Sequence, residues 1–407
     1  MPKNLAKCLQ LVIPKIIREL YCHIWGLKLE LKRALLLISS SLLAAFAFSI
    51  YQPLWPFLVE EAHVDPSLYG IIASGANLLE FLIRWMFAAF SSPSMTFLIG
   101  CLGISASSGV LLLGSSPSII LSSLSFSRVG RALSLMGRNQ IVSIFYRDKV
   151  GTAFGSARVA WQIGAVAGPA LGALLLVLLG RTWIFALGLM LGVVSALIII
   201  PLFREVPSKR KGKIAFWKGS LTPEIRGIVG LTVLNNFARN SFIPFHMVLA
   251  PAIFGAKIEH IALATVIERI VSLMTGVPIG WLSDRISDRR IILSLSELFM
   301  VLGIVMYILP GAGIPEFLAS TVLLGLGMAS YAPIAMAAVS ELALKNPEDA
   351  VAFLSTAVSF SRLPAPIITG FLISFFGYSS AFLLPMACLA IVGVGMLILS
   401  LKSRRVS

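Results

Sequence analysis

Ionisable side chains stand inside long apolar stretches of this chain, where a charge has chemical consequences. Of the 407 residues, 57% are hydrophobic and only 13% are charged. An ionised side chain at the centre of a bilayer costs roughly 2.5–3.5 kcal/mol even on a lenient insertion scale, so such a group must pair, face water or bind a ligand. The residues concerned are Glu80, Arg84, Arg128, Arg131, Arg239, Glu268, Arg269, Glu297 and Arg362.

The deepest of these charges do not balance. Arg84, Arg131 and Glu297 lie within snorkelling reach of the ends of their stretches. The remainder are four arginines and two glutamates: Arg128, Arg239, Arg269, Arg362, Glu80 and Glu268. Internal ion pairs that fix helix register leave at least two positive charges without a counter-ion on the chain. These charges either bind an anionic group of a ligand or are held by backbone carbonyls and water.

A polar band in the stretch 225–250 is the best candidate for a ligand site. Asn235 and Arg239 are four residues apart and share one helix face, and Asn236 and Asn240 share the next. These side chains donate several hydrogen bonds. We expect Asn235, Asn236 and Arg239 to contact a small-molecule ligand.

The stretches that carry these residues have the length of membrane-spanning helices. A run of roughly 20 apolar residues crosses the hydrocarbon core as a helix, because lipid offers the backbone no hydrogen-bond partners. The mean hydropathy of +0.93 excludes an ordinary soluble fold. We expect an all-α membrane protein with twelve spans, at about 34–58, 67–90, 94–114, 117–140, 154–179, 182–202, 225–250, 259–283, 289–310, 315–343, 350–376 and 379–401.

Basic residues orient these spans. One side of the expected topology holds nearly all Lys and Arg of the loops, including Lys209-Arg210-Lys211, whereas the other side holds only Arg181 and Lys257. The positive-inside rule then places both termini in the cytoplasm of a multi-pass cell-membrane protein. The net charge of +15 is explained by loops that meet anionic lipid headgroups, and no nucleic-acid partner is needed.

The chain divides into five expected segments. A basic N-terminal segment, 1–33, precedes a six-helix half at 34–203. A basic linker at 204–224 leads to a second six-helix half at 225–401, and 402–407 form a cytoplasmic tail.

Groupings typical of enzymes are missing from the sequence. The four histidines and four cysteines are scattered, without a His-x-x-x-His pair, a Ser/His/Asp grouping, or metal or redox spacing. No Gly-x-x-x-x-Gly-Lys-[Ser/Thr] loop occurs either. We therefore expect no enzyme activity, no cofactor and no metal.

The segment from Gly280 to Arg290, GWLSDRISDRR, resembles a loop motif of the major facilitator superfamily. That motif reads Gly-x-Leu-x-Asp-Arg-x-Gly-Arg-Arg, and Asp288 stands where the family has its second glycine. Asp284 is positioned to accept hydrogen bonds from Arg285 or Arg289, which predicts a latch at the cytoplasmic face. A basic loop that only sets topology is the alternative.

A second match lies in the expected fifth helix. Gly164, Gly168, Pro169 and Gly172 are similar to a motif in helix 5 of the superfamily's proton-coupled exporters, and glycines four apart let another helix approach closely. Pro169 and Pro366 fall at corresponding depths of the two halves, as an internal repeat requires.

The resemblance implies two pseudo-symmetric six-helix halves around a central cavity lined by helices 1, 4, 7 and 10. Arg128 and Arg239 would face that cavity. Helices 2, 5, 8 and 11 would form the contact between halves, so that Gly164, Gly168 and Pro169 belong to the interface and Arg362 faces Glu80 across it.

The same resemblance implies a secondary active transporter that works by alternating access as a monomer. The helix 5 motif favours proton-coupled efflux of a small organic compound by an antiporter. The excess of deep arginines favours a small organic anion instead, and a non-transporting membrane sensor is a remote alternative.

A proton-coupling carboxylate must titrate near the midplane. Glu80 has Arg84 one turn away. Glu268 has only Arg269, about 100° around the helix, so Glu268 is preferred over Glu80 as the coupling residue.

Overall fold

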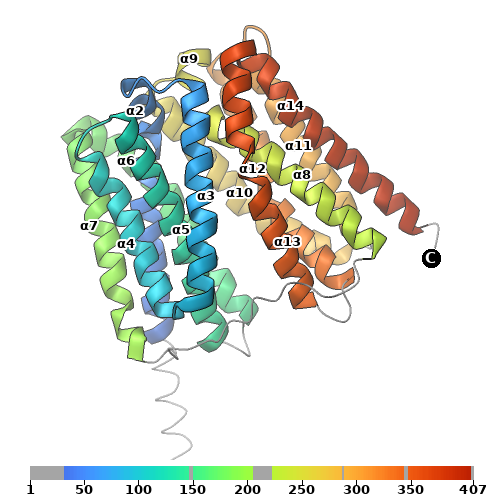
Figure 1. Ribbon diagram of the computed structural model, residues 1–407, viewed down its shortest axis with the longest axis horizontal. Helices are drawn as coiled ribbons and strands as arrows, with labels where there is room; N and C mark the ends of the chain where they lie inside the picture. Colours follow the sequence, from blue (N-terminus) through green and yellow to red (C-terminus); the bar gives the residue numbers. More distant parts are fainter. Residues whose placement is uncertain (1–31, 146–149, 205–221, 287, 343–346, 405–407) are drawn as a thin grey trace, which may run out of the picture.

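The protein is a bundle of long helices in two halves (Figure 1). The computed structural model describes residues 32–145, 150–204, 222–286, 288–342 and 347–404, and no strand occurs among them. The first half comprises a first helix at 32–49, then η1 (Gln52–Leu54), α2 (Trp55–Glu61), α3 (Pro66–Phe90), α4 (Pro93–Leu111), α5 (Pro117–Phe145), α6 (Val150–Leu179), α7 (Arg181–Ile199) and η3 (Ile200–Arg204).

The second half comprises α8 (Pro223–His246), α9 (Ala250–Phe254), α10 (Ile258–Arg285), α11 (Arg289–Ile308), α12 (Ile314–Leu342), α13 (Pro347–Ser361) and α14 (Ala365–Arg404). Gly377, with φ 77°, turns α14 back on itself, so this element contains two helices. The expected spans agree with these elements except at 350–376. Most of the basic N-terminal segment and of the linker lies outside the described residues.

Local sequence sets where the helices begin. Asp65, Ser92 and Thr222 each cap the helix that follows by accepting a hydrogen bond from a backbone N–H of its first turn. A proline follows each cap directly, where its missing N–H and fixed φ are favourable.

Eight helical segments of the described chain are long and apolar enough to cross a membrane. One of them, Thr356–Lys402, contains the turn at Gly377. Three long helices, α5, α8 and α10, fall outside this set. These three helices carry most of the midspan polar residues: Arg128, Arg131, Asn235, Asn236, Arg239, Glu268 and Arg269. Apolar helices therefore surround a few helices whose polar residues must face the protein.

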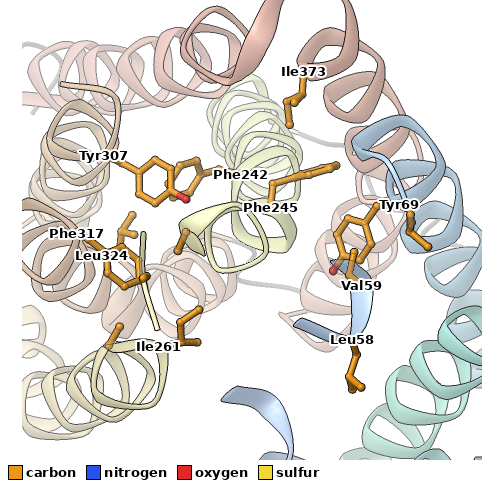
Figure 2. Close-up of a cluster of buried hydrophobic side chains, with 14 of the residues drawn as sticks. Leu58, Val59, Tyr69, Phe242, Phe245, Ile261, Tyr307, Phe317, Leu324 and Ile373 are labelled. Atoms are coloured by element: carbon orange, nitrogen blue, oxygen red, sulfur yellow. The ribbon is translucent and has the colours of Figure 1, made fainter. Parts of the chain in front are cut away.

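The two halves share a core at one end of the bundle and have separate cores at the other. We call the end at which Arg204 leaves the first half and Pro223 enters the second the linker end. A large cluster at the opposite end combines Tyr69 and Val59 of the first half with Phe242 and Phe245 of the second. Figure 2 shows Tyr69 facing Phe245, and their rings pack edge to face with centroids 5.4 Å apart.

At the linker end each half has its own cluster. One contains only residues of the first half, such as Leu37 and Trp161, and the other only residues of the second, such as Ile225 and Leu354. Among the described residues, the two halves therefore share a hydrophobic core only at the opposite end.

Helices α3 and α14 make the closest contact between the halves. A Cβ added at Gly70 would overlap the carbonyl oxygen of Pro366 and lie 3.2 Å from the Cα of Gly370. A Cβ at Gly370 would overlap the carbonyl oxygen of Pro66 in turn. Glycine is required on both sides because backbone meets backbone here.

The helix expected at 350–376 is broken. α13 ends at Ser361 and α14 begins at Ala365, with a turn that contains Arg362 between them. Pro364 and Pro366 explain the break, because proline removes a backbone donor and its ring clashes with the preceding turn. The corresponding Pro169 lies inside the unbroken α6, so the two halves differ at this depth.

Candidate functional site

Four arginines from both halves gather between the halves at mid-height. Arg128 and Arg131 lie on α5, Arg269 lies on α10, and Arg362 lies in the break before α14; we call these four residues the arginine cluster. Electrostatic interactions join Arg131 to Arg269, Arg362, Arg128 and Glu80. The sequence singled out each of these residues, but only the fold brings them together.

Arg131 faces the space between the halves. Its side chain is exposed although it lies near the middle of α5, and its guanidinium lies 5.4 Å from the ring centroid of Phe48 on the first helix. Since its electrostatic partners include Arg269 and Arg362 of the second half, the exposed surface is not on the lipid side. Snorkelling therefore does not describe Arg131.

Glu80 is the carboxylate of this site. The ion pair that we expected with Arg362 across the two halves is present, with 3.8 Å between Arg362 NH1 and Glu80 Oε1. The Nε atoms of Arg269 and Arg362 are buried without a hydrogen-bond partner among the described residues. Even with Glu268, which interacts with Arg269, cations outnumber carboxylates here by two.

Asn77 links the site to the broken helix. This buried amide on α3 accepts a hydrogen bond from Arg128 and donates one of 3.0 Å to the backbone carbonyl of Arg362. From α8, Asn236 donates to the carbonyl of Val358 (2.8 Å) and to Ser361 Oγ (3.1 Å). Amides from both halves thus bind the carbonyls that the helix break leaves open.

Asn235 and Arg239, which we expected at the ligand site, contact a buried glutamate within the second half. Asn235 donates a hydrogen bond of 2.7 Å to Glu297 Oε1, and Arg239 NH2 lies 3.8 Å from the same oxygen. The side chain of Glu297 is 1% exposed, so our expectation that it snorkels to the surface is wrong. The cause is the direction of α11, which turns Glu297 toward α8 rather than toward lipid.

Glu268 faces a histidine that the sequence did not pair with it. His246 Nε2, at the end of α8, lies 3.7 Å from Glu268 Oε2. His246 is buried, stacks on Phe242, and contacts the carbonyl of Ile243 through Nδ1. Arg269 is therefore not the only basic residue beside Glu268.

The loop motif at the linker end forms its described contacts within the second half. Arg289 pairs with Glu341 of α12 at 2.7 Å and donates to Ser283 Oγ, whereas Arg285 is exposed. The side chain of Asp284 lies outside the described residues, so the expected latch stays a prediction.

Asp288, which replaces the family's glycine, caps α11 and pairs with Arg290 at 2.8 Å. Arg290 also reaches Glu224 of α8 at 2.5 Å. Burial raises the pKa of Asp288, but hydrogen bonds from Arg290 and Ser400 outweigh burial and lower that pKa below its usual value.

The glycines of α6 contact the first helix of their own half. A Cβ at Gly164 would overlap the carbonyl oxygen of Leu42, and one at Gly168 would overlap Ser49 Oγ. We expected Gly164, Gly168 and Pro169 at the contact between the halves. For the two glycines the structure corrects this, because their bare face lies against residues 42–50, although α6 also packs on α10 of the second half.

The sequence analysis did not single out Asn77 or His246, and it misplaced Glu297. Asn77 was hidden as a single amide in an apolar run, Glu297 by its short distance along the chain from a helix end, and His246 by its position at a helix end. An amide or carboxylate within a membrane span indicates a buried polar contact, but the sequence does not identify its partner because that residue lies on another helix.

Comparisons with known proteins agree with this architecture. A family model described as Major Facilitator Superfamily matches residues 37–254 and again 228–407. A protein of Methanocaldococcus jannaschii named as an uncharacterized MFS-type transporter is 25% identical over 365 residues, which cover 84% of this chain and 88% of that protein.

Solved structures share the fold at low identity. A point mutant of the peptide transporter POT, in complex with sulfate, aligns with a TM-score of 0.76 at 12% identity, covering 91% of this chain and 94% of that one. A point mutant of the nucleoside transporter NupG aligns with a TM-score of 0.70 at 12% identity, covering 90% and 99%. With helices, halves and family model in agreement, the chain belongs to the major facilitator superfamily and is a membrane transporter.

Proposed function

We propose that this transporter carries a small organic anion, held by the arginine cluster, and works by alternating access. The observation that carries the proposal is the gathering of Arg128, Arg131, Arg269 and Arg362 from both halves, where cations outnumber the carboxylates Glu80 and Glu268 among the described residues. A ligand bound between the halves at this depth would contact both of them, as alternating access requires.

The charge imbalance supports an anionic substrate. Arginines in a site shielded from bulk water are costly unless an anion or hydrogen-bond acceptors compensate them. Arg128 has Asn77 and Arg362 has Glu80, whereas Arg269 keeps a buried Nε without a described partner and Arg131 is exposed to the space between the halves. A carboxylate or phosphate group is the complementary ligand for such guanidinium groups.

The two ends of the bundle differ, and the difference indicates to which side of the membrane this form is closed. The halves share a core at the opposite end, and basic loops cluster at the linker end. Under the positive-inside rule this is the form closed to the outside, with both termini in the cytoplasm of the cell membrane.

Proton-coupled export of a small organic compound is the second candidate. The Gly164-x-x-x-Gly168-Pro169 pattern, similar to that of proton-coupled exporters, favours it, and so do carboxylates inside the helices. The two candidates differ in the charge of the substrate, because an uncharged substrate would not require the arginine cluster for binding.

Substrate exchange in proteoliposomes tests the proposal. Arg131→Gln should weaken binding of the transported anion, since a charge-assisted hydrogen bond is worth about 1.5–3 kcal/mol, or roughly 10- to 150-fold in Kd. Arg226→Gln, at an exposed arginine near the linker end of α8, is the matched control. Chemically matched anionic and neutral compounds should differ only in proteins that retain Arg131. Equal exchange of both classes by the wild-type protein would reject an anionic substrate.

A further inference from the structure

A buried carboxylate in the second half is placed to bind a proton, at a distance from the arginine cluster. Glu297 lies on α11 with its side chain 1% exposed. One oxygen, Oε1, accepts the hydrogen bond of Asn235, and the other, Oε2, is buried without a partner among the described residues. A carboxylate with an unmatched buried oxygen is poorly stabilised in its charged form, because burial favours the neutral acid.

The arginine beside it does not depend on the ion pair. Arg239 NH2 donates a hydrogen bond of 2.9 Å to the carbonyl of Gly327, and its guanidinium lies 5.1 Å from the ring centroid of Tyr331, both on α12. Its distance to Glu297 Oε1 is longer, 3.8 Å. If Glu297 takes up a proton, Arg239 keeps two of its three contacts, so the charge of Arg239 is still compensated when Glu297 is neutral.

The groups around Glu297 come from α8, α12 and α14. From α8 these are Asn235 and Arg239, and from α12 they are Tyr331, which interacts electrostatically with Glu297, and the carbonyl of Gly327. α14 presents Gly393, where an added Cβ would lie 3.3 Å from the Cβ of Glu297.

α10 contributes no described contact with Glu297. Its midspan ionisable residues, Glu268 and Arg269, interact with His246 and with the arginine cluster. Arg239 is therefore the one cation that bears on Glu297 among the described residues, whereas Glu268 has two basic neighbours.

We propose that Glu297 is a proton-binding site of this transporter, with Arg239 and Asn235 as its positioning residues. Protonation converts the carboxylate to a carboxylic acid and removes the electrostatic pairing with Arg239. That arginine of α8 keeps its contacts with α12. Because the pair joins α8 to α11 and Arg239 also contacts α12, proton binding changes the ties among three helices of one half. The proposal rests on the proposed function only for the statement that this proton drives the transport of the anion.

Infrared spectroscopy of the full-length protein in lipid, titrated with pH and without substrate, tests the site directly. The wild type should gain a carboxylic-acid carbonyl band on acidification, at a pH above that of exposed carboxylates. Glu297→Gln should lose this band and Glu268→Gln, the matched control, should retain it. A wild type without the band, a band that persists in Glu297→Gln, or one lost only in Glu268→Gln would overturn the proposal.

A second variant keeps the proposal testable if Glu297→Gln fails to fold. Asn235→Ala removes the hydrogen bond to the charged form, so the band should appear about one pH unit higher, a tenfold change in proton affinity. An unshifted midpoint in this variant contradicts the assignment. Because the titration uses no substrate, its failure would refute the proton site and leave the anion site standing, whereas equal exchange of anionic and neutral compounds would refute the anion site alone.

Discussion

Replacing Gly70 by alanine should open the opposite end of the transporter. In this form of the protein the added Cβ would overlap the carbonyl oxygen of Pro366 and lie 3.2 Å from the Cα of Gly370. Backbone on both sides cannot yield by a rotamer change, so α3 and α14 must separate. Overpacking of this kind costs about 1–3 kcal/mol. The cost applies only to the form in which the halves touch here, so the ratio of the two forms should shift by about 5- to 150-fold.

Gly75 provides the matched control on the same helix. A Cβ at Gly75 would have no atom within 4 Å. Both substitutions gain about 1 kcal/mol of helix propensity, which is the same in either form of the protein and does not shift their ratio. Gly70→Ala and Gly75→Ala therefore differ only in the contact with α14.

A cysteine at a buried position of the shared core reports the opening. Ile373, 7% exposed, belongs to the cluster that joins the halves (Figure 2). In an Ile373→Cys background without other cysteines, alkylation by an impermeant reagent should be faster with Gly70→Ala than with Gly75→Ala. Equal rates would refute the assignment of this contact as the closure between the halves.

Three further outcomes follow from contacts of the described residues. Asn77→Ala should lower the free energy of unfolding by about 1–3 kcal/mol and weaken anion binding, because it leaves Arg128 without its amide partner. Unchanged anion binding would contradict the link between Asn77 and the arginine cluster. Gly168→Ala, whose Cβ would overlap Ser49 Oγ, should lower the unfolding temperature without changing the rate of alkylation at Ile373→Cys. A changed alkylation rate would show that Gly168 contributes to the contact between the halves. Asp288→Asn should lower the free energy of unfolding by about 1 kcal/mol at neutral pH, because the charge-assisted hydrogen bond with Arg290 is lost. Since folding lowers the pKa of Asp288, the wild type loses this advantage progressively as the pH falls below about 4, and a difference in unfolding temperature that does not shrink on acidification would refute the contribution of its charge.

Helix positions were predictable because they depend on information local in the chain. The expected span at 67–90 corresponds to Pro66–Phe90, and the one at 289–310 to Arg289–Ile308. Long apolar runs require helices in lipid, and prolines after capping residues fix where these helices begin. The fold class and the family motif needed no knowledge of contacts.

Pairing among the polar residues was less predictable because it depends on rotation of each helix about its axis. The pairing of Glu80 with Arg362 was expected from the helix neighbours that the family resemblance implies, and the structure contains it. Depth along a helix can be counted from the sequence alone. The same counting placed Glu297 within reach of the surface. Its true direction, toward Asn235, follows from how α11 packs on its neighbours, and no count along one helix contains that information.

The corrected pairing changes what the arginine excess means. Arg239 was one of the charges without a counter-ion, and Glu297 now accounts for it inside the second half. The unmatched charges that remain belong to the arginine cluster, and they lie between the halves, where both halves can bind one ligand. Charge that neither half compensates alone, placed where the halves separate and meet, favours a substrate that supplies the missing negative charge. If Glu297 binds a proton as proposed, the substrate and the proton are bound by separate residues.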